Sequence, residues 1–189
     1  MAERYEMRFA GSGGQGIILI SVILAEAAVI AGKQAVQSQS YGPEARGGLC
    51  KAETILSNGT IWFSKVTKPN FLFALTQASL NKYSAELAEN WVLVTDTSLE
   101  VPAALDSSRV LKLPVLDTAK DKVGKLMTAN IVAVGAINRL LGLVDEESLK
   151  EAVLKHIPAG TEELNGKALA EGAALISDKQ AAKFRQATV

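Results

Sequence analysis

The sequence has one cysteine and one histidine among its 189 residues. One cysteine cannot form an internal disulfide or a CxxC pair, and one histidine cannot build a histidine-rich metal site. The chain alone therefore has no plausible ligand set for a zinc ion, a haem or an iron–sulfur cluster. We also expect no Ser/His/Asp or Cys/His triad, because His156 lies in the last turn of a predicted helix.

An excess of charge of one sign is also absent, since 20 Lys and Arg residues balance 20 Asp and Glu residues. Nucleic acids and anionic membranes attract clustered cations, so neither is an expected partner. The longest apolar run, residues 17–31, contains Glu26 and is 15 residues long, whereas a bilayer span needs about 20. The first eight residues are polar and do not resemble a signal peptide. We therefore expect a cytoplasmic protein with one domain over residues 1–189.

The opening of the chain is typical of a doubly wound α/β protein. Residues 7–10 predict a short buried strand, Ile17–Ile30 a helix that is apolar almost all round, and residues 33–38 a second strand. Gly32 is a natural helix C-cap, and the βαβ crossover is expected to be right-handed.

The rest of the chain predicts an antiparallel insertion followed by helices. Asn58-Gly59 is a strong hairpin signal and predicts that residues 49–56 pair with residues 61–63. Further strands are predicted at residues 91–94 and 109–113, and helices at residues 71–88, 131–141, 145–156 and 162–183. The predicted fold class is α/β, a Rossmann-like and mostly parallel sheet with an inserted β-hairpin and a helical C-terminal third.

A glycine-rich segment joins the first predicted strand to the first helix. It fits the pattern G-x-G-x-x-G, with the residues Gly11, Gly13, Gly14, Gln15 and Gly16. Glycines in this context let backbone amides at a helix N-terminus approach a phosphate, although they also serve tight turning and close packing alone. A nicotinamide site would further need an acid or an arginine at the end of the second strand, and residues 36–40 contain neither.

A second specialised loop follows the second predicted strand and should lie at the same edge of the sheet. The aromatic ring of Tyr41, the carboxylate of Glu44 and the guanidinium of Arg46 suit bidentate pairing or anion recognition. A structural loop closed by its own acid–arginine pair is the alternative. The residues concerned are Tyr41, Gly42, Pro43, Glu44, Arg46, Gly47 and Gly48.

Together the two loops resemble the gamma subunit, or gamma domain, of 2-oxoacid:ferredoxin (acceptor) oxidoreductases. The G-x-G-G-Q-G pattern of that family is matched at residues 11–16, and its Y-G-P-E-x-R-G-G pattern is matched without a departure at residues 41–48. The resemblance covers about residues 8–183. Two weaker features are a helix led by Asn130 and an N-x-x-A-x-x-x-G pattern at Asn165, Ala168 and Gly172.

The resemblance implies a subunit of an enzyme that oxidatively decarboxylates a 2-oxoacid to an acyl-coenzyme A and CO2. In the family, thiamine diphosphate and magnesium lie between alpha and beta components, and iron–sulfur clusters lie on cysteine-rich, ferredoxin-like (delta) partners. Electrons pass to ferredoxin or another acceptor. This chain would hold no cofactor alone and would be inactive when isolated. It looks most similar to the 2-oxoglutarate type, while 2-oxoisovalerate and pyruvate types share the core motifs.

The implied role of the chain is to assemble with the thiamine-bearing subunits and to complete their site. The two glycine loops and Asn130 would form the contact, with Arg46 and backbone amides available to a coenzyme A phosphate or a partner carboxylate. A purely structural role stays open. A free-standing dinucleotide-binding dehydrogenase or nucleotide-binding module is the alternative from another class. The isolated chain would expose its docking patch and can then self-associate as a homodimer.

Five other residues carry weaker expectations. Cys50 is expected to be a small buried residue, and His156 to cap a helix or lie at the surface. Trp62 and Trp91 are expected to be core or interface anchors. Asp96 lies where a ligand would bind at the end of a strand, but a helix cap explains it equally well.

Overall fold

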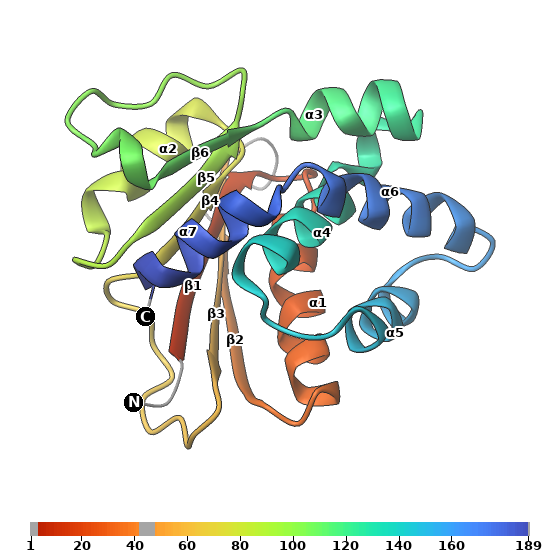
Figure 1. Ribbon diagram of the computed structural model, residues 1–189, viewed down its shortest axis with the longest axis horizontal. Helices are drawn as coiled ribbons and strands as arrows, with labels where there is room; N and C mark the ends of the chain where they lie inside the picture. Colours follow the sequence, from red (N-terminus) through yellow and green to blue (C-terminus); the bar gives the residue numbers. More distant parts are fainter. Residues whose placement is uncertain (1–3, 42–47, 189) are drawn as a thin grey trace.

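The computed structural model describes residues 4–41 and 48–188, and the strands in these ranges form one six-stranded sheet of order β2-β3-β1-β4-β5-β6 (Figure 1). Strands β1, β4, β5 and β6 run parallel to one another, whereas β3 is antiparallel to both β1 and β2. The strands are β1 (Arg4–Ser12), β2 (Gln34–Tyr41), β3 (Leu49–Ser57), β4 (Phe71–Ala74), β5 (Val92–Asp96) and β6 (Val110–Leu113).

The helices are divided unequally between the two faces of the sheet. One large core packs α1, α4, α5, α6 and α7 on one face, and a smaller core under α2 covers the other face beside β4 and β5. Figure 1 shows α7 crossing in front of the strands. The helices are α1 (Ile17–Ile30), α2 (Gln77–Tyr83), α3 (Val115–Asp117, extended by a π turn at Thr118–Val123), α4 (Ala129–Leu141), α5 (Glu146–His156), α6 (Glu162–Ala174) and α7 (Asp178–Thr188).

This arrangement confirms the predicted fold class and the β1–α1–β2 opening. Helix α1 has the predicted bounds and buries eight of its residues. Gly32 follows it with a left-handed φ of 78°, as its predicted place after the helix C-terminus requires.

The predicted partner of the inserted strand was wrong. Residues 61–63 form no strand, and β3 instead pairs with β1 on one side and β2 on the other. A strand has only two edges, so none remained for residues 61–63. Asn58-Gly59 therefore starts a loop rather than a two-residue hairpin.

The predicted helix over residues 71–88 was also wrong in its first part. Phe71–Ala74 is strand β4, fully buried between β1 and β5. A short continuous apolar run does not separate a buried strand from a buried helix by periodicity. Helix α2 starts later, after Thr76, whose side chain accepts a hydrogen bond from the Ser79 amide in a capping box.

The predicted helix over residues 162–183 is two helices. The chain turns after α6, and Ser177 starts α7 by exchanging hydrogen bonds with Gln180. This S-x-x-Q capping box was readable in the sequence.

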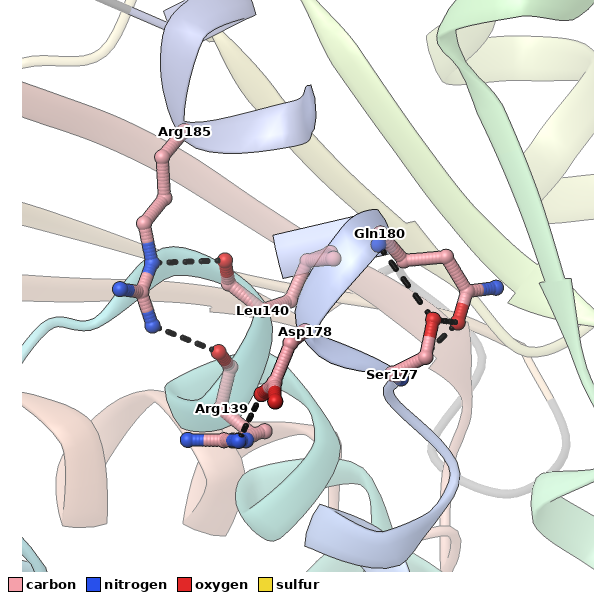
Figure 2. A network of polar contacts seen from close by, with 6 residues as sticks. All are labelled: Arg139, Leu140, Ser177, Asp178, Gln180 and Arg185. Atoms are coloured by element: carbon pink, nitrogen blue, oxygen red, sulfur yellow. Dashed lines mark hydrogen bonds and ion pairs between the residues drawn. The ribbon is translucent and has the colours of Figure 1, made fainter. Parts of the chain in front are cut away.

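Polar contacts fasten α7 to the C-terminal end of α4 (Figure 2). Arg185 donates from Nε to the Leu140 carbonyl at 3.2 Å and from Nη2 to the Arg139 carbonyl at 2.9 Å. Asp178 pairs with the Arg139 guanidinium at the other end of α7. The last carbonyls of α4, which lack partners within their own helix, are thereby satisfied by α7.

The N-x-x-A-x-x-x-G pattern forms the face of α6 that packs on α4. Its three residues, Asn165, Ala168 and Gly172, are the buried residues of α6. A Cβ atom at Gly172 would lie 2.0 Å from the Val132 carbonyl oxygen, so the two helices meet at backbone contact there. The pattern is explained by helix packing.

A buried ion-pair network lies on the sheet face that α2 only partly covers. Arg8 in β1 donates from Nε to Glu53 of β3 at 2.8 Å, and it also pairs with Glu86. The side chains of Arg8 and Glu53 are 3% and 8% exposed. The Arg8 guanidinium lies 5.3 Å from the centre of the Tyr83 ring. Each buried charge of this network thus has a partner of opposite sign.

Candidate functional site

The glycine-rich turn lies at the carboxyl end of β1, where the chain order of the sheet reverses. From β1 the chain passes through α1 to β2 on one side, and β4 to β6 continue the sheet on the other side. Ligands of open α/β sheets bind in the crevice at such switch points. We call the carboxyl end of β1, with the segments that meet there, the rim.

Hydrogen bonds fix the shape of the turn itself. The Ser12 amide donates to Gln15 Oε1 at 2.8 Å, and the Gln15 amide donates back to the Ser12 carbonyl at 3.3 Å. Gln15 therefore closes the turn. Gly13 and Gly14 at its tip are exposed.

Packing explains two other glycines of the motif. A Cβ atom at Gly11 would lie 2.6 Å from Gln15 Oε1 and 2.8 Å from Ile17 Cδ1. Gly16, the N-cap of α1, has a left-handed φ of 71°, and a Cβ atom there would lie 2.5 Å from Nδ2 of Asn130. The structure thus brings Asn130, at the start of α4, against the glycine turn.

The second loop reaches the same rim. The Gly13 amide donates to the Gly48 carbonyl at 3.3 Å, and the backbone of Tyr41 ends β2 beside Cys50 of β3. The two loops are therefore neighbours at their described ends. Five of the candidate residues lie outside the described residues: Gly42, Pro43, Glu44, Arg46 and Gly47.

The N-terminus of α1 carries no capping side chain among the described residues, and its first turn contains no acid. The positive end of the helix dipole and the first backbone amides thus face the rim without a local carboxylate. Chemically, this end of α1 suits a phosphate or a carboxylate.

The sheet order disfavours an ordinary dinucleotide site. In that site the second strand lies directly beside the first and supplies an acid to the ribose. Here β3 lies between β1 and β2, so the end of β2 is two strand spacings, about 10 Å, from β1. Moreover, β2 contains no Asp or Glu along its length.

An exposed apolar pair beside the rim was missed by the sequence reading. Leu126 and Met127 are 54% and 80% exposed and precede the helix that carries Asn130. The sequence offered one indication of this exposure, since the two apolar residues stand between the polar residues Lys125 and Thr128. Exposed apolar groups of this size beside a specialised loop indicate a contact surface.

Two of the weaker expectations concern the sheet. Cys50 is 5% exposed, as expected, and burial raises the pKa of its thiol. Asp96 acts as a cap: Oδ1 accepts from the Ser98 amide at 3.0 Å and Oδ2 from the Leu116 amide at 3.0 Å. Both oxygens of Asp96 are therefore engaged within the fold.

The other three residues lie nearer the surface. His156 ends α5, and its Nε2 lies 2.5 Å from Glu26 Oε2 on α1. Trp91 is partly buried under Arg109, whose guanidinium lies 5.8 Å from its ring. Trp62 is 91% exposed, so a core role for it is excluded.

The described residues offer neither a cluster of metal ligands nor a membrane-spanning helix. In residues 4–41 and 48–188 no three or more His, Cys, Asp or Glu side chains are grouped to hold a metal ion. Nor does any helix in these ranges have the length and hydropathy to cross a membrane.

Comparison with known proteins places the chain in a family. Residues 6–175 match the model of the pyruvate ferredoxin/flavodoxin oxidoreductase family. The 2-oxoglutarate synthase subunit KorC of Methanocaldococcus jannaschii is 42% identical over 172 residues, which cover 89% of this chain and 92% of that protein.

Solved structures agree with this assignment. The gamma subunit of a keto/oxoacid ferredoxin oxidoreductase from Geobacter sulfurreducens is 47% identical, with a TM-score of 0.77 over 89% of this chain and 95% of its own. A 2-oxoglutarate:ferredoxin oxidoreductase from Magnetococcus marinus, at 22% identity, shares the fold with a TM-score of 0.83 over 92% of this chain and 31% of its own. The chain belongs to the pyruvate ferredoxin/flavodoxin oxidoreductase family.

Proposed function

We propose that this chain is the gamma subunit of a multi-subunit 2-oxoglutarate:ferredoxin oxidoreductase, which converts a 2-oxoacid to an acyl-coenzyme A and CO2. The curated relative with 42% identity is a 2-oxoglutarate synthase subunit, which supports this substrate over pyruvate and 2-oxoisovalerate. Residues 1–189 act as one gamma-type domain in the cytoplasm. Partner subunits of alpha, beta and delta type hold the thiamine diphosphate, the magnesium and the iron–sulfur clusters.

The observation that carries the proposal is the meeting of the two family loops at one rim. The hydrogen bond from the Gly13 amide to the Gly48 carbonyl joins them, and Asn130 packs on Gly16 beside them. A turn needed only for packing would not require a second loop whose sequence contains an acid, an aromatic ring and a guanidinium. The exposed pair of Leu126 and Met127 adds apolar surface at the same place.

The rim has two chemical tasks in this proposal. The uncapped N-terminus of α1, together with Arg46, binds either a coenzyme A phosphate or a carboxylate of a thiamine-bearing subunit. The apolar pair and the glycine turn dock against that subunit and exclude water from the contact. Coenzyme A supplies the thiol that accepts the acyl group, and this chain would orient it in the first of these two cases.

Arg46→Ala tests this role, with Lys179→Ala as a control because Lys179 is an exposed cation on α7. We expect the complex that carries Arg46→Ala either to lose partner subunits on purification or to show a raised KM for coenzyme A. The first result assigns Arg46 to docking and the second to the coenzyme. Normal assembly with an unchanged KM and turnover would refute the role of the loop.

The alternative, a free-standing dehydrogenase or nucleotide-binding module, has no support in the curated and solved relatives named above. Both of the close relatives are named as subunits. The position of β3 between β1 and β2 also speaks against an ordinary dinucleotide site. A homodimer of the isolated chain would be a consequence of its uncovered docking surface.

A further inference from the structure

The loop that joins β3 to β4 carries the most exposed large hydrophobic side chain among the described residues. We call residues 58–70 the aromatic loop. Trp62 is 91% exposed and Phe63 is 60% exposed, and they are consecutive. Tryptophan at such exposure leaves a large apolar surface in water, and tryptophan is among the residues that most often dominate binding at protein interfaces.

The backbone around this aromatic pair is anchored. Val66 is 3% exposed and holds the middle of the loop against the fold. At its end, Asn70 accepts from the Glu6 amide at 2.8 Å and donates to the Arg4 carbonyl at 3.1 Å. Arg4 also donates to the Phe63 carbonyl at 3.4 Å. The loop therefore holds Trp62 outward on a supported backbone, which reduces the entropy cost of binding.

The aromatic loop also carries uncompensated positive charge. Lys65 and Lys68 are both exposed, and within the described part of the chain neither makes an ion pair. Arg4, whose side chain contacts the loop at Phe63, is paired with Glu6 at 2.9 Å. An aromatic pair flanked by two unpaired cations complements an acidic surface with an apolar recess.

The loop lies at the opposite end of the sheet from the rim. Its first residues follow Ser57, which pairs with Arg4 at the start of β1, whereas the glycine turn follows Ser12 at the end of β1. Nine residues of strand separate the two ends by about 30 Å. In Figure 1 the loop is the gold segment near the N-terminus, at the lower end of the sheet. A partner that covers the rim need not cover this loop.

We propose that the aromatic loop is a second docking element, which inserts Trp62 into an apolar recess of a partner subunit while Lys65 and Lys68 pair with carboxylates at the edge of that recess. The inference rests on the proposed function in one respect, since the partner is another subunit of the same complex. A protein partner fits better than an anionic lipid surface, because two cations on a chain of zero net charge give little attraction to a membrane.

The test is made on the complex purified through a tag on this chain. A zero-length carbodiimide joins a lysine to a carboxylate only where the two are in contact, and mass spectrometry then identifies the joined peptides. We expect Lys65 or Lys68 to be joined to Asp or Glu of a partner subunit, and Lys179 on α7 to be joined to none. We also expect Trp62→Ala to weaken retention of that subunit at least about tenfold. Val29→Ala, at an exposed apolar position on α1, should leave retention unchanged.

The outcomes separate this inference from the proposed function. If the partners are retained but Trp62→Ala has no effect and no joined peptide contains Lys65 or Lys68, the second docking element is refuted and the proposed function stands. If no partner is retained by the unaltered chain, both fail. If the chain sediments with phosphatidylglycerol vesicles in a manner that depends on Trp62, the loop binds lipid and a protein partner is refuted. Circular dichroism of the variant checks that it is folded.

Discussion

The contact between α4 and α6 gives a sharp test of how the C-terminal helices pack. Replacing Gly172 by alanine adds a Cβ atom 2.0 Å from the Val132 carbonyl oxygen and 2.8 Å from its carbon. Both contacts are to backbone, so rotation of a side chain cannot relieve them. The helices must move apart at the point where they are most closely packed.

The expected change in the free energy of unfolding of Gly172→Ala follows from two opposed effects. Overpacking of a well-packed core costs about 3 kcal/mol at its upper range, and alanine is better than glycine in a helix by about 1 kcal/mol. The net expected loss is about 2 kcal/mol in the free energy of unfolding. For a domain of this size that loss corresponds to a fall in Tm of about 4 to 8 °C.

Gly166→Ala on the same helix is the matched control. Nothing lies within 4 Å of a Cβ atom at Gly166, so only the gain in helix propensity applies there. We expect Tm to rise by up to about 4 °C in thermal unfolding followed by circular dichroism. Equal stability of Gly172→Ala and the unaltered chain, or a loss at Gly166, would refute the account of this helix contact.

Three further predictions concern charges and the glycine turn. Glu53→Gln leaves the buried Arg8 with Glu86 as its only acidic partner, and we expect the free energy of unfolding, measured in urea, to fall by about 3 kcal/mol. The control Glu6→Gln, in a more exposed pair, should lower it by less than about 1 kcal/mol. Equal losses in the two variants would contradict the buried network. His156 and Lys155 lower the pKa of Glu26 below its usual 4.5, so the ionised Glu26 stabilises the fold above pH 4.5 and this contribution is lost as the pH falls through the lowered pKa. Glu26→Gln should therefore flatten the acid side of a plot of unfolding free energy against pH. An unchanged plot would disprove the pairing. Gly16→Ala places a Cβ atom on a backbone with a left-handed φ and against Asn130, so we expect the free energy of unfolding to fall by about 2 kcal/mol. An unchanged melting curve would contradict this expectation.

Local signals predicted much of the fold, because they depend on neighbours in the sequence. The apolar helix α1 and the Gly32 cap have the predicted places. The acidic start of α5 after Asp145 was equally readable, since the Asp145 side chain accepts from the Ser148 amide. The signal for each of these features lies within its own stretch of sequence.

The errors arose where pairing between distant segments decides the structure. Whether Phe71–Ala74 is strand or helix depends on β1 and β5 on either side, which a local pattern does not contain. Likewise, residues 61–63 lost their predicted pairing because β1 and β2 occupy both edges of β3.

The candidate site was located from two motifs that a strand–turn–helix context brings to one edge of the sheet. Their nearness could be predicted from parallel strand ends, and the Gly13–Gly48 hydrogen bond confirms it for the described residues. The contact of Asn130 with Gly16 joins segments more than a hundred residues apart, and no local pattern predicts such a contact. The exposure of Leu126, Met127 and Trp62 likewise depends on the whole fold.

The most direct test of the central claim is an anaerobic pull-down of the tagged chain from its native cell extract, followed by a coenzyme A dependent assay of the eluate on a panel of 2-oxoacids. We expect partner subunits in the eluate and activity on 2-oxoglutarate above that on pyruvate or 2-oxoisovalerate. Recovery of the chain alone, with a bound nucleotide and no activity on any 2-oxoacid, would contradict the account and favour a nucleotide-binding module.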